Sequence, residues 1–157
     1  MLFNTNKQKG NVGLGIAIAY YTTNGYIVSI PLNDTQDYDL IVDNNKIEKI
    51  QVKATSCKTK YGNYQVALKS CGGTKGRDYK TVIDTNIDKL FIVTDKLDVY
   101  IIPKEGIKNR STINLCEKYN RFKISKVIWF RTMFDVWLTD NLEYSYELQK
   151  TFGYYNS

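Results

Sequence analysis

Three side chains in the first third of the chain, Asp39, Gln51 and Lys53, could hold a metal ion against a phosphate. Oxygen atoms, including those of carboxylates and amides, are the ligands that the hard cation Mg²⁺ prefers. A cation held there acidifies a bound water and stabilises charge on the phosphoryl oxygens. A lysine beside it can orient or deprotonate that water and neutralise charge in the transition state. By spacing alone, an Asp–Lys pair with an exposed glutamine is more often an ordinary sheet surface, so the chemistry depends on what brings the three together.

The strand pattern around these residues predicts that they converge. We expect two strands, over residues 38–43 and 47–55, joined as a hairpin. Side chains alternate across a strand, which puts Gln51 and Lys53 on one face and leaves an apolar set for a face packed on a helix: Ile50, Val52 and Ala54. A three-residue loop of two asparagines and a lysine then places Asp39 opposite Gln51. A two-residue loop would send the apolar sets of the two strands to opposite faces, so core burial selects the first register.

The remaining pattern predicts an N-terminal helix and several more strands. The helix is expected over residues 7–23, after a capping region and before an Asn24-Gly25 stop. Its three glycines weaken an isolated helix by up to about 1 kcal/mol each, and we expect close approach to a neighbouring backbone to compensate: Gly10, Gly13 and Gly15. Strands are expected at 26–32 (where Pro31 puts the strand at an edge or ends it), 64–70, 90–94 and 99–102. The apolar segment 126–138 is expected to be buried, in the core rather than in an oligomer surface.

The composition excludes several classes of catalytic and metal-binding site. The chain of 157 residues is long enough for one domain with its own core. It contains no histidine, which excludes Ser-His-Asp and Cys-His catalysis and histidine-bound zinc. Its three cysteines show no metal-binding or disulfide spacing. The N-terminus does not resemble a signal peptide and no apolar run is long enough to cross a membrane, so we expect an intracellular protein.

The charge is modestly positive, with 22 Lys and Arg against 16 Asp and Glu and a formal net charge of +6. Most of the excess lies in residues 46–80, where Glu48 and Asp78 are the only acids. The basic residues of this span are Lys46, Lys49, Lys53, Lys58, Lys60, Lys69, Lys75, Arg77 and Lys80. Such a run is compatible with a solvated basic face or with a surface that contacts phosphates.

An ordered set of short matches resembles the group I intron-associated branch of the PD-(D/E)XK nucleases. The matches are Lys9–Gly13, Gly25-Tyr26, Ile30–Leu32, Tyr38–Val42, Gln51–Lys53, Leu90–Thr94 and Val99–Pro103. The resemblance implies an α/β fold with a restriction-endonuclease-like core, a central mixed β-sheet flanked by helices. It implies a single nuclease domain over 1–157, with its core at about 7–105. The extension at about 106–157 would complete that core or form an oligomer surface.

The resemblance also implies a function, a Mg²⁺-dependent endonuclease that cleaves double-stranded DNA, of a site-specific homing type. Mn²⁺ is expected to substitute for Mg²⁺, and a homodimer or homotetramer is expected to act. Asp39 and Gln51 match the metal ligands and Lys53 matches the catalytic lysine of the family motif. Lys58, Lys60, Lys75 and Arg77 are the candidate DNA-phosphate contacts.

Two departures from the family pattern leave alternatives open. Gln51 stands where an acid is common, and Leu14 stands where many members carry a helix glutamate that points into the site. Either a second metal is not needed, or Asp34, Asp37 or a backbone carbonyl replaces that ligand, or activity is reduced. A structure-selective nuclease, such as a Holliday-junction resolvase, and a catalytically silent DNA-binding protein are the alternative functions.

Overall fold

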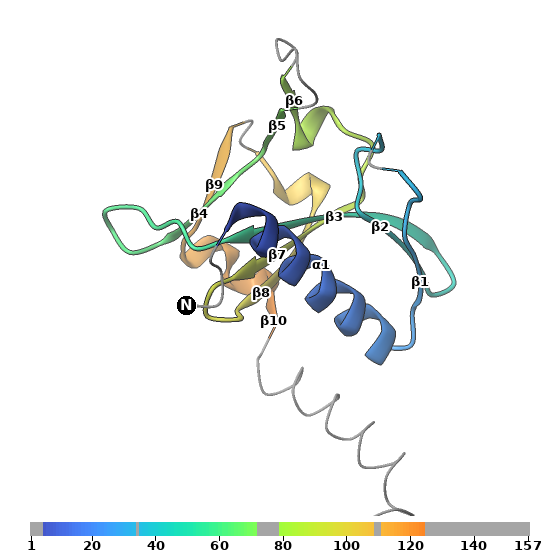
Figure 1. Cartoon of the computed structure of the whole chain (residues 1–157). Helices are drawn as coiled ribbons and strands as arrows, with labels where there is room; N and C mark the ends of the chain where they lie inside the picture. The colour runs from blue at the N-terminus through green and yellow to red at the C-terminus, as the bar shows by residue number, and fades with distance from the viewer. Residues whose placement is uncertain (1–4, 34, 72–78, 109–110, 125–157) are drawn as a thin grey trace, which may run out of the picture.

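The computed structural model describes residues 5–33, 35–71, 79–108 and 111–124. A six-stranded mixed sheet with the order β1-β2-β3-β7-β8-β10 forms its centre, and helix α1 lies across one face of that sheet (Figure 1). The bounds are α1 Asn6–Thr23, β1 Ile27–Ser29, β2 Leu40–Asp43, β3 Ile47–Thr55, β7 Lys89–Thr94, β8 Val99–Pro103 and β10 Lys123–Ile124. Two small antiparallel pairs add to it, β4 (Tyr64–Ala67) with β9 (Thr112–Leu115), and β5 (Lys69–Cys71) with β6 (Tyr79–Thr81). Three short 3₁₀ helices complete the described residues, η1 (Val82–Asp84), η2 (Lys104–Gly106) and η3 (Glu117–Phe122).

Helix α1 begins and ends where its capping signals predict. The side chain of Thr5 accepts a hydrogen bond from the Gln8 amide at 3.2 Å, which satisfies one of the free N–H groups of the first turn. At the other end Gly25 has φ +80°, a left-handed conformation that favours glycine after a helix.

The close approach expected of the helix glycines is confirmed at Gly13 alone. A Cβ atom placed on Gly13 would lie 3.1 Å from Cβ of Ala54, so a larger residue would push α1 away from β3. At Gly10 and Gly15 nothing lies within 4 Å of such an atom, and the expected compensation is wrong for these two positions.

The β2–β3 hairpin adopts the predicted register. Asp43 pairs with Ile47 and Ile41 pairs with Lys49, which leaves the predicted three-residue loop between the strands. Asn45 in that loop has φ +63°, the left-handed position that this hairpin type requires. The side chains of Leu40, Val42, Ile50 and Val52 therefore face α1, and those of Gln51 and Lys53 face away from it.

Two apolar cores lie on the two faces of the sheet. The core under α1 consists of Ala17, Tyr21, Leu40, Val42, Ile50, Phe91, Val93 and Val99. The opposite core lies under β4, β9 and η3, and includes Val66, Leu68, Leu90, Ile92, Ile102, Ile113 and Tyr119. Alternation along the buried strand β7 sends successive residues to different cores, as expected for a strand covered on both sides.

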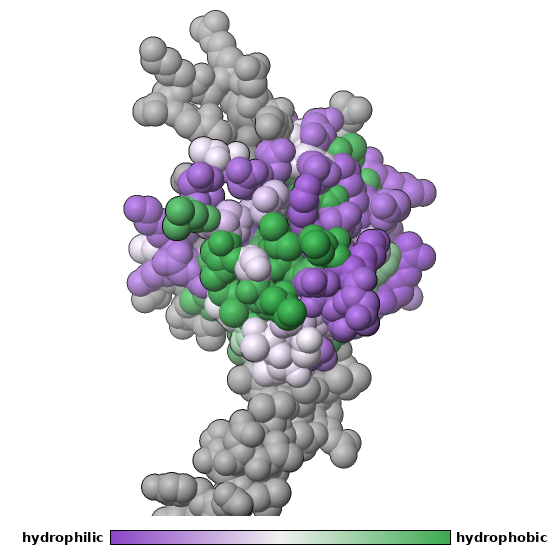
Figure 2. All heavy atoms as spheres, turned by 90° about the vertical axis from the view of Figure 1, so that its right-hand side faces the viewer, coloured by the Kyte–Doolittle hydropathy of each residue, from purple (hydrophilic) through white to green (hydrophobic). Residues whose placement is uncertain are grey.

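Apolar side chains are also exposed at the edge of the sheet. They gather on the side of the molecule formed by β1 and the β2–β3 hairpin, where Ile27 is 70% and Ile47 is 65% exposed (Figure 2). Among the described residues no helix is long and apolar enough to cross a membrane.

Candidate active site

Gln51 occupies the middle of β3 on the face opposite α1. It pairs with Leu90 of β7 in the parallel part of the sheet, and only 7% of the residue is exposed. Its side-chain oxygen Oε1 is buried and has no hydrogen-bond partner among the described residues. A buried oxygen without a partner costs about 1–3 kcal/mol, so this atom is suited to a ligand that the protein alone does not supply.

Asp39 is tied to β3 by two hydrogen bonds. Its backbone amide donates to the carbonyl of Ile50 at 2.9 Å, just before β2 begins. Its carboxylate oxygen Oδ2 accepts a hydrogen bond from the backbone amide of Val52 at 2.6 Å. Because Val52 lies between Gln51 and Lys53, the backbone of β3 itself holds the carboxylate beside these two side chains.

The surroundings of Asp39 raise the pKa of its carboxyl group. The largest cause is the protein packed around the carboxylate, which removes water; the hydrogen bond from Val52 and the positive charge of Lys53 lower the pKa but do not cancel that effect. The residue still exposes a large part of its surface, so the shift reflects crowding at the carboxylate and not burial of the whole residue.

Lys53 lies two residues beyond Gln51 on the same face of β3, about 6–7 Å away along the strand. It is half-buried, and its charge acts on the Asp39 carboxylate. The structure therefore brings together the three residues that the hairpin register predicts.

No second acid joins this cluster from helix α1. Leu14 lines the same pocket as Asp39, together with Tyr38 and Ile30, so an apolar side chain stands where a helix carboxylate would reach the site. Asp37 is half-buried nearby in the chain, and Asp34 lies outside the described residues. In the described part of the chain, no three His, Cys, Asp or Glu side chains are grouped as a metal site would require.

This donor set fits a Mg²⁺ ion held by few protein ligands. Asp39 offers a carboxylate and Gln51 a buried amide oxygen in need of a partner. Mg²⁺ is bound in many enzymes by one or two carboxylates plus water and substrate phosphates, so a protein contribution of one carboxylate and one amide is sufficient.

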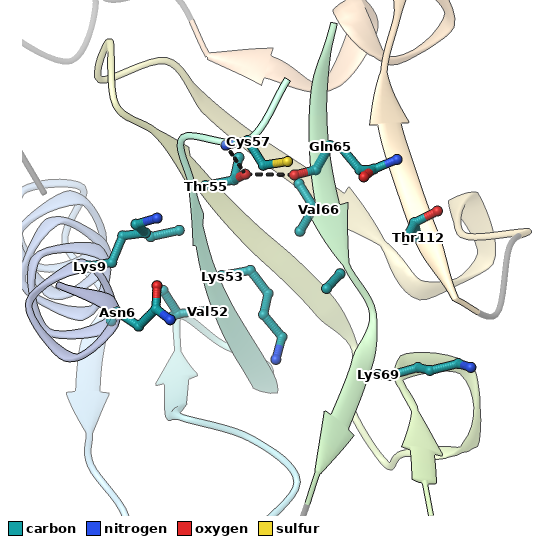
Figure 3. A pocket seen from close by; sticks show the side chains of 13 residues that line it. Asn6, Lys9, Val52, Lys53, Thr55, Cys57, Gln65, Val66, Lys69 and Thr112 are labelled. Carbon is teal, nitrogen blue, oxygen red and sulfur yellow. Dashed lines mark hydrogen bonds between the residues drawn. The ribbon is translucent and has the colours of Figure 1, made fainter. Parts of the chain in front are cut away.

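A groove of about 470 Å³ opens beside Lys53 (Figure 3). It lies between the first turns of α1 and strands β4 and β9, with β3 as its floor. Lys9, Lys53 and Lys69 line it, and no Asp or Glu does among the residues that the structure describes. Lys9 and Asn6 were not among the predicted site residues, because nothing in their spacing shows that α1 meets β4 across β3.

Of the four candidate DNA contacts, Lys58 and Lys60 lie in the described residues and both are exposed. The Nζ atom of Lys58 lies 4.9 Å from the ring centre of Tyr64, and that of Lys60 lies 4.9 Å from the ring centre of Tyr61. Each ammonium group therefore lies over an aromatic ring while the lysine as a whole stays exposed. Lys75 and Arg77 lie outside the described residues, as does the segment 126–138.

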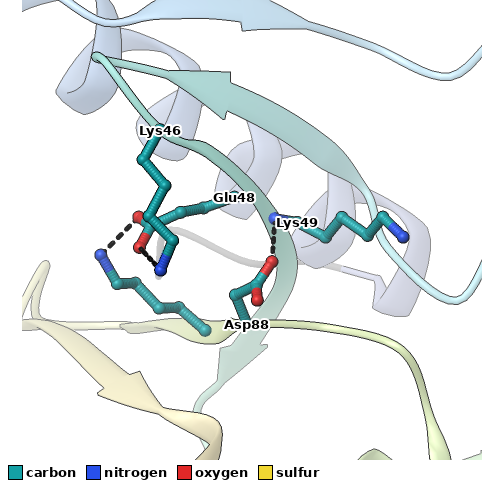
Figure 4. A network of polar contacts seen from close by, with 5 residues as sticks. Lys46, Glu48, Lys49 and Asp88 are labelled. Carbon is teal, nitrogen blue, oxygen red and sulfur yellow. Dashed lines mark hydrogen bonds and ion pairs between the residues drawn. The ribbon is translucent and has the colours of Figure 1, made fainter.

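Polar contacts fix the alignment of β3 with β7 at the end where the two strands begin to pair (Figure 4). Glu48 accepts a hydrogen bond from Lys89 at 2.5 Å, and its side chain is only 12% exposed. Asp88 accepts from the Lys49 amide at 2.7 Å and donates its own amide to the Lys49 carbonyl at 2.8 Å. These contacts set the parallel register that packs Gln51 against β7.

Comparison with known proteins agrees with the fold and identifies the family. The chain matches a solved bacterial homing endonuclease, I-Ssp6803I, with a TM-score of 0.61 and 23% sequence identity, over 98% of this chain and 100% of the other. That match shows a shared fold. A comparison with curated protein sequences found no match. The model of the PD-(D/E)XK endonuclease family matches residues 4–136, most of the chain, and the chain therefore belongs to the PD-(D/E)XK endonuclease family.

Proposed function

We propose that this protein is a Mg²⁺-dependent endonuclease that hydrolyses phosphodiester bonds of double-stranded DNA, of a site-specific homing type. The observation that carries the proposal is the buried Oε1 atom of Gln51, which has no hydrogen-bond partner in the described part of the chain and lies beside a carboxylate and a lysine. Membership of an endonuclease family and the fold shared with a homing endonuclease support the same reaction.

In this proposal Asp39 and Gln51 hold the metal, and Lys53 acts on the attacking water. When bound, the cation acidifies a water and stabilises negative charge on the phosphate. The Val52 amide fixes the orientation of the Asp39 carboxylate. Lys53 orients or deprotonates the water and neutralises charge that develops in the transition state. Mn²⁺ should substitute for Mg²⁺, because it accepts the same oxygen ligands.

Exposed lysines contribute affinity for the DNA backbone. In this proposal Lys58 and Lys60 contact phosphates, and these contacts position the duplex without reading its sequence. If about eight phosphates are contacted in total, affinity falls about 10³- to 10⁵-fold between 50 and 200 mM salt. A salt response much flatter than this would contradict an extended DNA interface.

We also propose that the protein acts as a homodimer or homotetramer. One cleavage centre cuts one strand, so cutting both strands of a duplex at one site takes two centres. Sedimentation with and without duplex DNA measures the assembly, and a protein that stays monomeric while making double-strand breaks would contradict this part of the proposal.

The function is tested by incubating the full chain with a panel of nucleic acids. Supercoiled plasmid, linear duplex, a four-way junction and duplex RNA are compared in Mg²⁺ and in EDTA. The proposal predicts nicks and breaks in DNA duplex in Mg²⁺ only. Faster cutting of the four-way junction would indicate a structure-selective nuclease instead. DNA binding without cutting under any divalent metal would indicate a silent relative, which Leu14 and Gln51 make the principal alternative.

A further inference from the structure

The groove beside Lys53 has a basic lining, and apart from Lys53 its residues take no part in the proposed cleavage step. Three lysines line it from three different elements: Lys9 of α1, Lys53 of β3 and Lys69 of β5, whose side chain points away from the other two in Figure 3. Its other polar lining residues are neutral: Asn6, Thr55, Cys57, Gln65 and Thr112. With Lys9 and Lys53 in its lining and no acid among the described lining residues, this hollow attracts anions and disfavours cations.

Lys9 is positioned within this groove by a neutral partner. Its Nζ atom donates a hydrogen bond to Oγ of Ser56 at 2.8 Å, just beyond the end of β3. The hydroxyl orients the ammonium group without neutralising its charge, so two of its three donors stay available for an anion. Asn6, one turn earlier on the same helix, points its amide into the same space (Figure 3).

The groove adjoins the proposed cleavage centre through Lys53, which belongs to both. The floor of the groove runs along β3 from Val52 to Thr55, and Gln51 lies immediately before it. From Gln51 to Thr55 the strand covers about 13 Å, and each DNA strand carries a phosphate about every 3.4 Å of helical rise. A DNA strand that follows β3 away from the cleavage centre therefore brings to Lys9 a phosphate that lies a few nucleotides from the cleaved one.

We propose that this groove is a second phosphate site, in which Lys9 and Asn6 bind a backbone phosphate of the DNA strand a few nucleotides from the phosphate that is cleaved. The site holds the strand in register with the metal and Lys53, so Lys9 is a binding and positioning residue. This inference rests on the proposed nuclease function.

The first test is the salt dependence of duplex binding, measured by fluorescence anisotropy in EDTA so that no cleavage occurs. Loss of one phosphate contact in Lys9→Gln should make the slope of log affinity against log salt less steep by about 0.9. Lys9→Arg should keep the wild-type slope. Lys7→Gln is the matched control, because Lys7 is an exposed lysine two residues away that does not line the groove. An unchanged slope in Lys9→Gln, or an equal change in Lys7→Gln, would overturn the proposal.

A second pair of variants separates binding from folding. Asn6→Asp places a negative charge in the groove, at a helix N-terminus where an acid stabilises the helix. It should weaken DNA binding about tenfold without lowering the melting temperature. Gln8→Glu adds the same charge to the same turn outside the groove lining and should change affinity less than about twofold. Equal effects of the two variants would contradict a localised phosphate site.

Two further measurements separate a DNA-phosphate contact from a structural role of Lys9 and from a free-anion site. Ser56→Ala removes the hydrogen bond to Lys9 but keeps its charge, so it should leave the salt slope unchanged; a slope like that of Lys9→Gln would show a purely structural role. Saturable binding of inorganic phosphate, with a wild-type DNA slope in Lys9→Gln, would identify a free-anion site and overturn the proposal. Mg²⁺-dependent plasmid cleavage by the wild type reports the nuclease function separately, so the two failures are distinguishable.

Discussion

In the proposed metal site, Asp39 and Gln51 contribute in different ways. Asp39 must lose a proton before its carboxylate can bind a cation, whereas the amide oxygen of Gln51 is available at every pH. Gln51 gains a partner for a buried oxygen when the metal binds, but it brings no charge. Most of the attraction for the cation, and its dependence on pH, therefore comes from Asp39.

The first prediction concerns metal binding without any reaction. Mg²⁺ should stabilise the wild-type protein against unfolding, by about 2.7 kcal/mol at a concentration of 100 times its dissociation constant. Asp39→Asn keeps the size of the side chain but removes the charge, so the stabilisation should be lost. Thermal unfolding with increasing Mg²⁺ measures this. Equal stabilisation of both proteins would place the metal elsewhere.

The second prediction concerns pH and follows from the raised pKa of Asp39. As pH falls through that raised pKa, the carboxyl group takes up a proton, so Mg²⁺ affinity should be lost at a higher pH than the usual aspartate value near 3.9. In the metal-free protein the sign is opposite. The folded state holds this proton more tightly than the unfolded state, so the contribution of Asp39 to stability is present at low pH and is lost as pH rises through the folded pKa.

Calorimetric titration with Mg²⁺ between pH 4 and pH 8 checks the affinity, and unfolding of metal-free wild type against Asp39→Asn checks the stability. A metal affinity that does not fall as the pH is lowered, or that Asp39→Asn leaves unchanged, would contradict the assigned role of Asp39.

The third prediction is that substitutions of Gln51 change Mg²⁺ affinity and the stability of the metal-free protein in opposite directions. Gln51→Glu adds a second charge beside Asp39 and should tighten Mg²⁺ binding about tenfold while destabilising the metal-free protein. Gln51→Met removes the buried oxygen that lacks a partner, and should stabilise the metal-free protein by about 1–3 kcal/mol while weakening metal binding. Paired titration and unfolding measurements test both. If Gln51→Met lowers stability, the oxygen has a partner in the folded protein after all.

At the scale of elements, α1 packs on the face of β3 opposite Gln51 and Lys53 and so fixes the position of that strand. The fourth prediction compares two glycines of this helix. Gly13→Val should destabilise the protein by about 1–3 kcal/mol, because a Cβ there already meets Ala54 at 3.1 Å and any larger group overpacks the contact. Gly15→Ala, in open space, should stabilise the protein by about 0.5–1 kcal/mol. Urea unfolding measures both, and equal effects would contradict the close contact of α1 with β3.

Elements whose structure depends mainly on their own residues can be predicted from the sequence. The hairpin of β2 and β3 has an apolar alternation and an asparagine loop, and together these allow one register. The capping Thr5 and the stop at Gly25 set the ends of α1 in the same way. The site residues Asp39, Gln51 and Lys53 follow from that hairpin, so their convergence was predictable before any relative was considered.

Elements that depend on distant partners were missed. β9 has four residues and pairs with β4, which lies far away in the sequence, and the two residues of β10 exist as a strand only beside β8. Neither has a periodic pattern long enough to indicate a strand. The groove residues Lys9 and Asn6 were missed for the same reason, since they join Lys53 only through the packing of α1, β3 and β4.

At the scale of the whole molecule, the two faces of the sheet differ: one packs on α1 and the other carries the proposed site. α1 covers one face, and the face that carries Gln51 and Lys53 continues into the basic groove (Figures 1 and 3). Exposed Ile27 and Ile47 lie away from the groove, at the β1 edge and the β2–β3 hairpin. A DNA strand can therefore run across the centre and the groove without contacting that apolar surface.

The most direct test of the central claim, that Asp39, Gln51 and Lys53 form a metal-dependent cleavage centre, is single-turnover cleavage of plasmid DNA in Mg²⁺. The fifth prediction is that Asp39→Ala and Lys53→Ala each reduce the cleavage rate at least about 100-fold, while both variants still bind the duplex. Lys53→Ala should also keep its stabilisation by Mg²⁺, which Asp39→Ala should lose. If both variants cut at the wild-type rate, the cleavage centre lies elsewhere and the account is wrong.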